Sequence, residues 1–448
     1  MTTLLYLVGV VLFVLAILAS IGLHELGHLI PAKAFGGKVT QYFIGFGPTV
    51  WSRQRGETEV GLKAIPLGGY VKIVGMLPPG ADRLGERQAD GSLKVRKSNT
   101  GLFTQLISDA RAAEWETIRP EDEDRLFYKL SWWKKVVVMA GGPSVNLLIA
   151  FVLFAILFGS YGLRELVADK GRPVLDEVTT CVIPYVEHRT ECLPSDPASP
   201  AKIAGLLPGD EITSFNGVAI SGWEQLRQLV RANQDGTATI GYLRDGVEHT
   251  ATTNTTVEAR PTSETDETLV QVGFLGVSPT SHVQVIRGGP LFTLGQMGGM
   301  VADSVEALVK LPVRVWGVAE AIAGVKERDP NGPVSIVGGG RIAGETASED
   351  FPLGDKAAAL VSLVAGFNLF IGLFNFVPLL PLDGGHIAGA LWEAVRRLLA
   401  RLGRLPDPGY VDVAKLLPVA YVVGSALLVM GVVLIVGDLV VPVHLSTD

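Results

Sequence analysis

Residues 4–30 read LLYLVGVVLFVLAILASIGLHELGHLI, an apolar run that ends in His24-Glu25-Leu26-Gly27-His28. A helix of roughly 20 apolar residues is long enough to cross the hydrocarbon of a bilayer. The run has no basic start and no small-residue cleavage site, so we interpret it as a retained membrane span rather than a signal peptide. Residues four apart on a helix share one face, so His24 and His28 can reach a single ion.

This spacing of two histidines around a glutamate is typical of zinc hydrolases. Zinc acidifies the water that it binds, and Glu25, one step around the helix, is placed to accept the proton. Three ionisable residues within five positions of an apolar helix need a compensating partner, because each is costly at membrane depth. The alternative is a set of polar residues at headgroup level. We expect a metal site, with His24 and His28 as ligands.

The two histidines leave tetrahedral zinc one protein ligand short, since water takes the fourth place. The best candidate is Asp383, in NFVPLLPLDGGH at residues 375–386. Pro378 and Pro381 stop the preceding helix, so this acid stands on a broken helix at membrane depth. The alternative is an aspartate that caps the next helix. For His386 we expect a supporting role rather than a ligating one.

The composition favours several membrane spans plus at least one water-soluble domain, because only 19% of the 448 residues are charged and the mean hydropathy is +0.35. A net charge of −7 argues against a nucleic-acid partner. Lysine and arginine gather on one side of the spans, which should be cytoplasmic. Both termini and the segment 161–356 are then extracytoplasmic. The predicted spans are residues 4–30, 136–162, 357–377 and 417–440.

At this point the motifs resemble those of the site-2 proteases, intramembrane zinc metalloproteases, especially the bacterial regulators of sigma-E type. The resemblance rests on HELGH in the first span and NxxPxxPLDG in the third. Further matching stretches are GFGP at 45–48, PLGGYVK at 66–72, GPSVN at 142–146 and GPVSI at 332–336. The resemblance implies one Zn²⁺ held by His24, His28 and Asp383, with Glu25 as the catalytic base.

The resemblance also implies a substrate and a location. The substrate would be a single-pass membrane protein, such as an anti-sigma factor already cut by a site-1 protease, or a remnant signal peptide. The enzyme would lie in the bacterial cytoplasmic (inner) membrane, with its active site toward the cytoplasm. Two rival functions remain: a membrane metal carrier would need the ligands but not Glu25, and a silent scaffold would need neither.

Residues 36–78 predict three short strands, at 39–44, 50–53 and 60–65. A small sheet with a free edge can accept an extended substrate as an added strand. We expect this edge near Gly45, Phe46 and Gly47, beside the zinc; the alternative is a hairpin that packs only against the spans. The resemblance suggests that Asn375 also binds the unwound substrate, whereas helix packing is the alternative for an asparagine in a span.

The outer segment contains SPAKIAGLLPGDEI at residues 199–212, which resembles a PDZ signature, followed by a hairpin turn at 215–218 and a helix at 223–232. One PDZ domain is found, as in shorter members of the family. It would either capture a peptide or act as a size filter that blocks intact substrates, and we favour the filter. Cys181 and Cys192 are disulfide candidates that would pin an inserted loop.

The predicted fold class is an α-helical polytopic membrane protein with four transmembrane helices, a small membrane-associated β-sheet and one extracytoplasmic PDZ (α+β) domain. Its predicted parts are the first span with the zinc motif (1–35), the hairpin or sheet (36–78), a polar cytoplasmic loop (79–130), the second span (131–163), the PDZ domain (172–282), amphipathic and linker helices (283–356), the third span with the aspartate (357–386), a cytoplasmic loop (387–416) and the fourth span (417–441).

Overall fold

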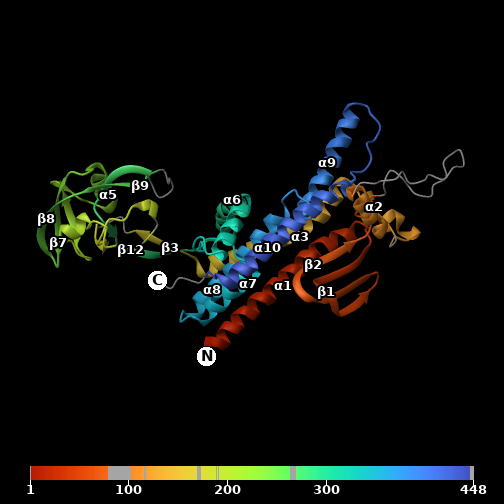
Figure 1. The fold of residues 1–448 in the computed structure, drawn as a ribbon, viewed down its shortest axis with the longest axis horizontal. Helices are drawn as coiled ribbons and strands as arrows, with labels where there is room; N and C mark the ends of the chain where they lie inside the picture. The colour runs from red at the N-terminus through yellow and green to blue at the C-terminus, as the bar shows by residue number, and fades with distance from the viewer. Residues whose placement is uncertain are drawn as a thin grey trace. The chain divides into compact units, whose positions relative to one another are not determined.

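A computed structural model describes residues 2–78, 102–115, 118–168, 173–187, 189, 191–262 and 269–443. The chain divides into two compact units (Figure 1). The first unit comprises Met1–Tyr161 and Arg287–Asp448, and the second comprises Gly162–Ile286. Of the polar loop predicted at 79–130, residues 79–101 and 116–117 lie outside the described residues.

Four helices of the first unit are long and apolar enough to cross a bilayer, which confirms the number of spans predicted. Their ends differ by a few residues from the predicted runs. The spans are Thr2–Ala34 (α1), Trp132–Tyr161 (α3, Trp132–Ile156, with the π-helical turn η3, Leu157–Tyr161), Leu353–Asn375 (α8) and Val413–Val440 (η5, Val413–Leu416, with α10, Leu417–Val440).

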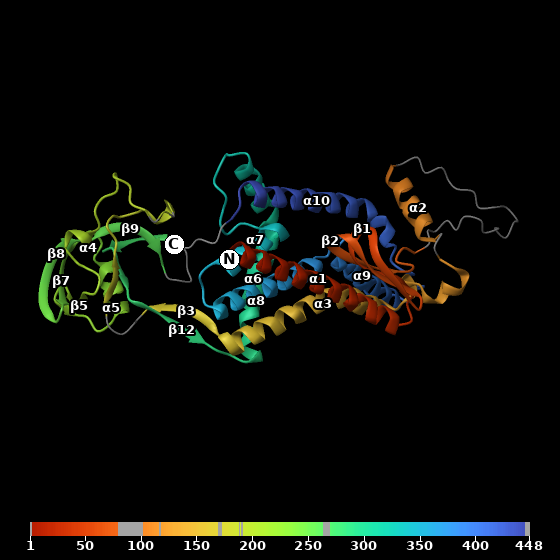
Figure 2. The same cartoon turned by 90° about the horizontal axis from the view of Figure 1, so that it is seen from below.

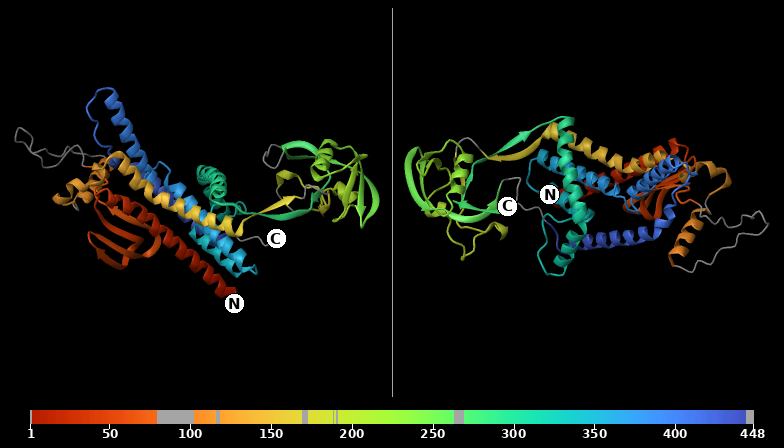
Figure 3. Two further views of the ribbon diagram at one scale, coloured as in Figure 1. Left: turned by 180° about the vertical axis from the view of Figure 1, so that it is seen from behind. Right: turned by 90° about the horizontal axis from the view of Figure 1, so that it is seen from above.

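Helices α1, α3 and α8 run alongside one another, and α7 (Ile336–Ser348) packs against α1 (Figure 2). Phe13 and Ile17 of α1 are buried together with Ala343 of α7. Asn368 in α8 donates a hydrogen bond of 3.0 Å to the hydroxyl of Ser20 in α1. Helix α6 (Pro290–Ile322), inside the segment 283–356 for which amphipathic and linker helices were predicted, lies across α3, α8 and α10 (Figure 3).

The segment after α1 forms two long strands, β1 (Val39–Arg55) and β2 (Thr58–Ile73), which lie beside α1. The prediction of three short strands is therefore wrong. Gly45 and Gly47 have φ values of +93° and +82°, so they redirect β1 without ending it. Residues 41–44 have strand partners on both sides, in residues 59–62 and in residues 69–72.

Because of this double pairing, the free edge of the sheet is not where it was predicted, near Gly45–Gly47. Residues 41–44, which lead into Gly45–Gly47, are interior to the sheet. Residues 69–72 pair only with residues 41–44 among the described strands, so their other side is an edge. The sequence could not show this arrangement, because each strand doubles back on itself through a register irregularity rather than through a turn motif.

The segment between α8 and α10 also differs from the prediction, which placed a loop at 387–416. Helix α9 spans Asp383–Leu402 and packs against α3. Its apolar residues are interrupted by arginines, which made the stretch look like a loop between spans.

On the same side of the unit, α2 (Leu102–Trp115) carries Glu114, whose carboxylate accepts hydrogen bonds from the N–H groups of Gly75 and Met76. Short 3-10 turns follow at Pro120–Arg125 (η1) and Phe127–Lys129 (η2).

The second unit is built around apolar side chains. Its four-stranded sheet has the order β6-β5-β7-β8, and Phe215, Ile212 and Ile240 are buried between this sheet and helix α5 (Trp223–Ala232). The predicted helix at 223–232 and the turn at 215–218 are confirmed. The remaining elements are β3 (Leu163–Ala168), β4 (Leu175–Val178), η4 (Tyr185–Glu187), α4 (Pro200–Ile203), β5 (Glu211–Phe215), β6 (Val218–Ala219), β7 (Thr237–Arg244), β8 (Val247–Asn254), β9 (Thr256–Pro261), β10 (Leu269–Phe274), β11 (Val277–Pro279) and β12 (Ser281–Ile286).

Candidate metal centre

The two histidines of α1 face the same point. Their Nε2 atoms are 3.3 Å apart, as expected for side chains one helical turn apart. His28 Nδ1 lies 2.8 Å from the carbonyl oxygen of Val138 in α3. A carbonyl can only accept a hydrogen bond, so Nδ1 carries the proton and Nε2 keeps its lone pair for the cluster. Val138 therefore fixes both the tautomer and the ring orientation of His28.

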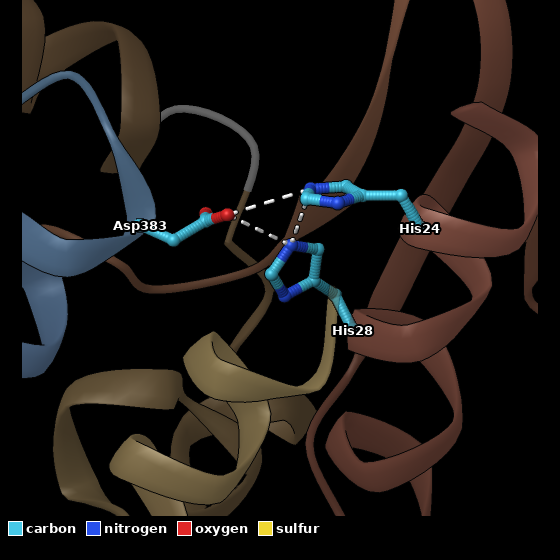
Figure 4. A group of neighbouring side chains, drawn as sticks. All are labelled: His24, His28 and Asp383. Atoms are coloured by element: carbon cyan, nitrogen blue, oxygen red, sulfur yellow. Dashed lines mark hydrogen bonds and ion pairs between the residues drawn. The ribbon is translucent and has the colours of Figure 1, made fainter. Parts of the chain in front are cut away.

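The third member of the cluster comes from α9, more than 350 positions later in the sequence. One carboxylate oxygen of Asp383, Oδ2, lies 3.4 Å from Nε2 of His24 and 3.3 Å from Nε2 of His28 (Figure 4). Asp383 is the first residue of α9, and Leu382 occupies the cap position. The cap position is therefore held by a leucine and not by Asp383, so the alternative interpretation of Asp383 as the helix cap does not apply.

These distances fit a metal ion. Four ligands placed about 2.1 Å from a tetrahedral zinc ion lie about 3.4 Å from one another. The three atom pairs formed by His24, His28 and Asp383 measure 3.3, 3.4 and 3.3 Å. Two imidazole lone pairs and a carboxylate oxygen pointing at one another repel unless a cation stands between them. Nitrogen and carboxylate donors of this kind suit zinc.

Two glycines allow close packing of the chain at the cluster. A β-carbon on Gly142 of α3 would lie 2.3 Å from Nε2 of His28 and 2.8 Å from Nε2 of His24. A β-carbon on Gly384 would lie 2.2 Å from the carbonyl oxygen of Val377, where the chain turns back between α8 and α9. Any larger residue at these two positions would displace the groups that converge on the centre.

Glu25 projects from α1 toward the sheet. Gly69 of β2 lies so close that a β-carbon there would be 2.9 Å from Cγ of Glu25. On the same face of α1, the hydroxyl of Tyr42 in β1 donates a hydrogen bond of 2.8 Å to the carbonyl of Gly22. The free edge at residues 69–72 is thus the part of the sheet that adjoins Glu25.

The other predicted site residues lie in different settings. Asn375 is the last residue of α8. Its side-chain amide donates a hydrogen bond of 3.2 Å to the carbonyl of Ile371, which lies in the same helix. Phe46 is exposed and stacks on Tyr70. In the second unit, Cys181 and Cys192 form a disulfide bond. His386 lines a small cavity beside Lys135 and Glu393.

Two features of the segments that surround the proposed centre were missed from the sequence. Val138 was missed because a backbone carbonyl carries no sequence signal. Lys135 and Glu393 form a buried ion pair between α3 and α9. Lysine at the start of an apolar run and glutamate inside a helix are each common, so neither stands out without its partner.

With this geometry in place, the comparison with known proteins has a clear outcome. A sequence model of peptidase family M50 matches residues 12–403. The chain belongs to this family. It is 33% identical over 449 residues to the zinc metalloprotease Rip1 of Mycolicibacterium smegmatis, which covers 98% of both chains. The Mycobacterium tuberculosis H37Rv protein of the same name is 33% identical over 456 residues, 98% of this chain and 99% of the relative.

A more distant relative is a putative zinc metalloprotease of Mesorhizobium japonicum, 30% identical over 389 residues, 86% of this chain and 88% of the relative. Family M50 contains the site-2 proteases, so the resemblance noted in the sequence is confirmed. The protein is a zinc metalloprotease with several membrane-crossing helices, its cofactor is Zn²⁺, and its activity is intramembrane proteolysis.

Proposed function

We propose that the protein hydrolyses a peptide bond inside or at the edge of the transmembrane helix of a single-pass membrane protein. In this proposal His24, His28 and Asp383 hold one zinc ion, and Glu25 is the catalytic base. The observation that carries the proposal is the convergence of three ligand atoms at 3.3–3.4 Å from two segments far apart in the chain.

The chemistry follows from the positions of the side chains. A zinc ion held there supplies a Lewis acid that polarises the scissile carbonyl and acidifies the attacking water. Glu25 takes the proton from that water and later gives it to the leaving amine. The carbonyl oxygen of Val138 keeps Nε2 of His28 available by accepting a hydrogen bond from the protonated Nδ1.

A helical substrate hides its amides in its own hydrogen bonds, so it must be extended before it is cut. The free edge at residues 69–72 adjoins Glu25 and offers backbone groups to an added strand. We place the unwound substrate along this edge. The bend at Gly45, Phe46 and Gly47 and the amide of Asn375 would flank it.

Photo-crosslinking tests the position of the substrate. A photoreactive residue at Lys72, which is exposed on the edge, should crosslink to a substrate trapped by a Glu25→Gln background. The same residue at Ser52, exposed on the far stretch of β1, is the matched control and should not. Equal crosslinking from both positions, or crosslinking from Ser52 alone, contradicts the proposed edge.

For the substrate class, we propose a membrane-anchored anti-sigma factor already shortened by a site-1 protease, or a remnant signal peptide. The second unit would fold as a PDZ domain outside the cytoplasm and exclude substrates whose outer domain is intact. The charge distribution along the sequence supports extracytoplasmic termini and a metal centre near the cytoplasmic face of the inner membrane. The sheet order, helix α5 and the connecting turn support the PDZ interpretation.

A Glu25→Gln variant separates this function from its rivals. We expect cleavage of a membrane-embedded substrate to fall by roughly 10²–10⁴-fold, the usual range for a lost acid–base group, while zinc content stays at one per chain. A metal carrier would keep full function without this carboxylate. A scaffold would bind its partners with or without zinc. Undiminished cleavage by Glu25→Gln would therefore overturn the assignment of the base.

A further inference from the structure

Lys135 and Glu393 form an ion pair in the interior of the first unit. Lys135 Nζ donates to Glu393 Oε2 at 2.7 Å, and the two residues are only 6% and 1% exposed. Charged side chains are almost never this deeply buried unless they are paired, and removing one partner leaves an uncompensated charge. The pair joins the start of α3 to the middle of α9 across 258 sequence positions.

Glu393 has further polar contacts besides the one with Lys135. Its other oxygen, Oε1, forms an ion pair with Arg397, one turn along α9, at 3.1 Å. The backbone N–H of Val411, in the segment that leads to α10, lies 3.4 Å from Oε2. Lys135 also lies over the ring of Tyr410, 5.0 Å from its centre. Only Lys135 among these groups belongs to α3, so it alone ties Glu393 to that helix.

The same two helices adjoin the proposed metal centre from two sides: α3 contacts the histidines of α1, and α9 carries Asp383. On α3, Val138 lies three positions after Lys135 and binds His28, and Gly142 touches both histidines one turn later. On α9, Asp383 lies ten positions before Glu393, about 15 Å along a helix axis. Sliding α9 by one residue would move Asp383 by about 1.5 Å and turn it by about 100°. Zinc–ligand distances tolerate only about 0.2 Å.

We propose that Lys135 and Glu393 are positioning residues that hold α9 in register with α3, and thereby hold Asp383 against His24 and His28. They touch neither metal nor substrate. This inference rests on the proposed metal ligands. It gives a function to a buried charge pair that the hydrolytic chemistry itself does not use.

The chain offers a matched control in a second buried pair. Arg328 donates to Asp438 at 3.1 Å, and their side chains are 7% and 2% exposed, which is close to the burial of Lys135 and Glu393. This pair joins the end of α10 to the segment before α7, and Asp438 also accepts the N–H of Ser335. Neither segment carries a metal ligand. Breaking it disturbs a buried charge without touching the α3–α9 register.

The test measures zinc affinity of the purified full-length protein by competition with a chelator, together with the visible spectrum of the Co²⁺-substituted form. Lys135→Met leaves Glu393 paired with Arg397, so the fold is retained. We expect its zinc affinity to fall by about 10–100-fold, the range for lost supporting partners of a metal site, with an altered Co²⁺ spectrum. Lys135→Arg and Asp438→Asn should behave like wild type.

Three results would overturn the inference. The first is a folded Lys135→Met with wild-type zinc affinity and spectrum. The second is an equal loss of affinity in Asp438→Asn, which would indicate general destabilisation. The third is failure of Lys135→Arg to restore binding. If thermal unfolding shows that Lys135→Met is not folded, Glu393→Gln carries the same test, because its amide keeps the shape of the site. Absence of zinc from wild type would instead contradict the proposed function itself.

Discussion

Both units of this protein bury apolar side chains, but the first unit buries more charged and ionisable groups than the second. The second unit is centred on apolar side chains such as Phe215, Ile212 and Leu226, which gain stability in proportion to the surface that they bury. The first unit, whose outer surface is already apolar, buries His28, Lys135, Glu393 and Asp438. Burying a charged group without a partner is unfavourable, so these side chains are stabilised by specific contacts with oppositely charged or polar groups. Small changes should therefore abolish function in the first unit and lower stability in the second.

The largest effect is expected from adding one methyl group beside the histidines. In Gly142→Ala the new carbon would lie 2.3 Å from Nε2 of His28, so the imidazoles must move out of ligating range. We expect zinc binding and cleavage to be lost. Gly366→Ala in α8 is the matched control, because nothing lies within 4 Å of the added carbon. Metal analysis and a cleavage assay check this, and normal zinc content in Gly142→Ala would contradict it.

Truncating a core side chain of the second unit should lower the stability of that unit without changing the zinc content. Phe215 is 1% exposed, and Phe215→Ala should lower the stability of that unit by about 3–5 kcal/mol. Zinc content should stay at one per chain. If the unit filters substrates, uncut substrate should now be cleaved, while cleavage of a shortened substrate is unchanged. Hydrogen exchange and a two-substrate assay test this. Continued rejection of uncut substrate by a variant with an unfolded second unit would contradict the filter.

The disulfide allows a milder test of the same unit. Cys181 and Cys192 are 11 positions apart, and closing a loop of this size stabilises a fold by about 2–3 kcal/mol. Replacing both with serine should lower the unfolding temperature of the second unit and leave cleavage unchanged. Differential scanning calorimetry and the cleavage assay measure the two effects. Lost cleavage in a folded double variant would mean that the loop contributes to activity.

The smallest effect is a pH dependence. Burial alone would raise the pKa of Asp210, but hydrogen bonds from Arg244 and from the N–H of Leu207 bring it below its ordinary value. A lowered folded-state pKa contributes stability that is present above the unfolded value near 3.9 and is lost as the pH falls through the folded value. Asp210→Asn should thus lower stability at pH 7 by roughly 1–2 kcal/mol.

The pH at which this difference disappears sharpens the prediction. Hydrogen exchange of β7 in wild type and Asp210→Asn should differ at neutral pH. The difference should begin to shrink as the pH falls below the unfolded pKa near 3.9, and it should disappear once the pH is below the lowered folded pKa of Asp210. A difference that is constant from pH 7 to pH 3 would show that shape, rather than charge, accounts for the contribution of Asp210.

The parts of the molecule that were predictable from sequence are those whose signals are local. Span lengths follow from continuous apolar runs, and the i, i+4 spacing of His24 and His28 defines one helix face. The turn at 215–218 and helix α5 also have local signatures. The assignment of Asp383 rested on a broken helix at membrane depth, which is again a local pattern.

The rest depended on contacts between distant segments. Each strand of the β1–β2 sheet doubles back, so the interior position of residues 41–44 is set by partners in both halves of β2. Helix α9 is amphipathic and lacks the unbroken apolar run of a span, which is why it was taken for a loop. The pairing of Lys135 with Glu393 exists only in three dimensions. The sequence thus pointed to the three proposed ligands but not to the contacts that hold them together.

The most direct test of the central claim is the zinc content of the purified protein beside that of an Asp383→Ala variant. Wild type should contain one zinc per chain, bound to nitrogen and oxygen donors by X-ray absorption. Loss of the carboxylate from α9 should release most of the metal and abolish cleavage, although α1 with both histidines is intact. An Asp383→Ala protein that keeps stoichiometric zinc and full turnover would contradict the account.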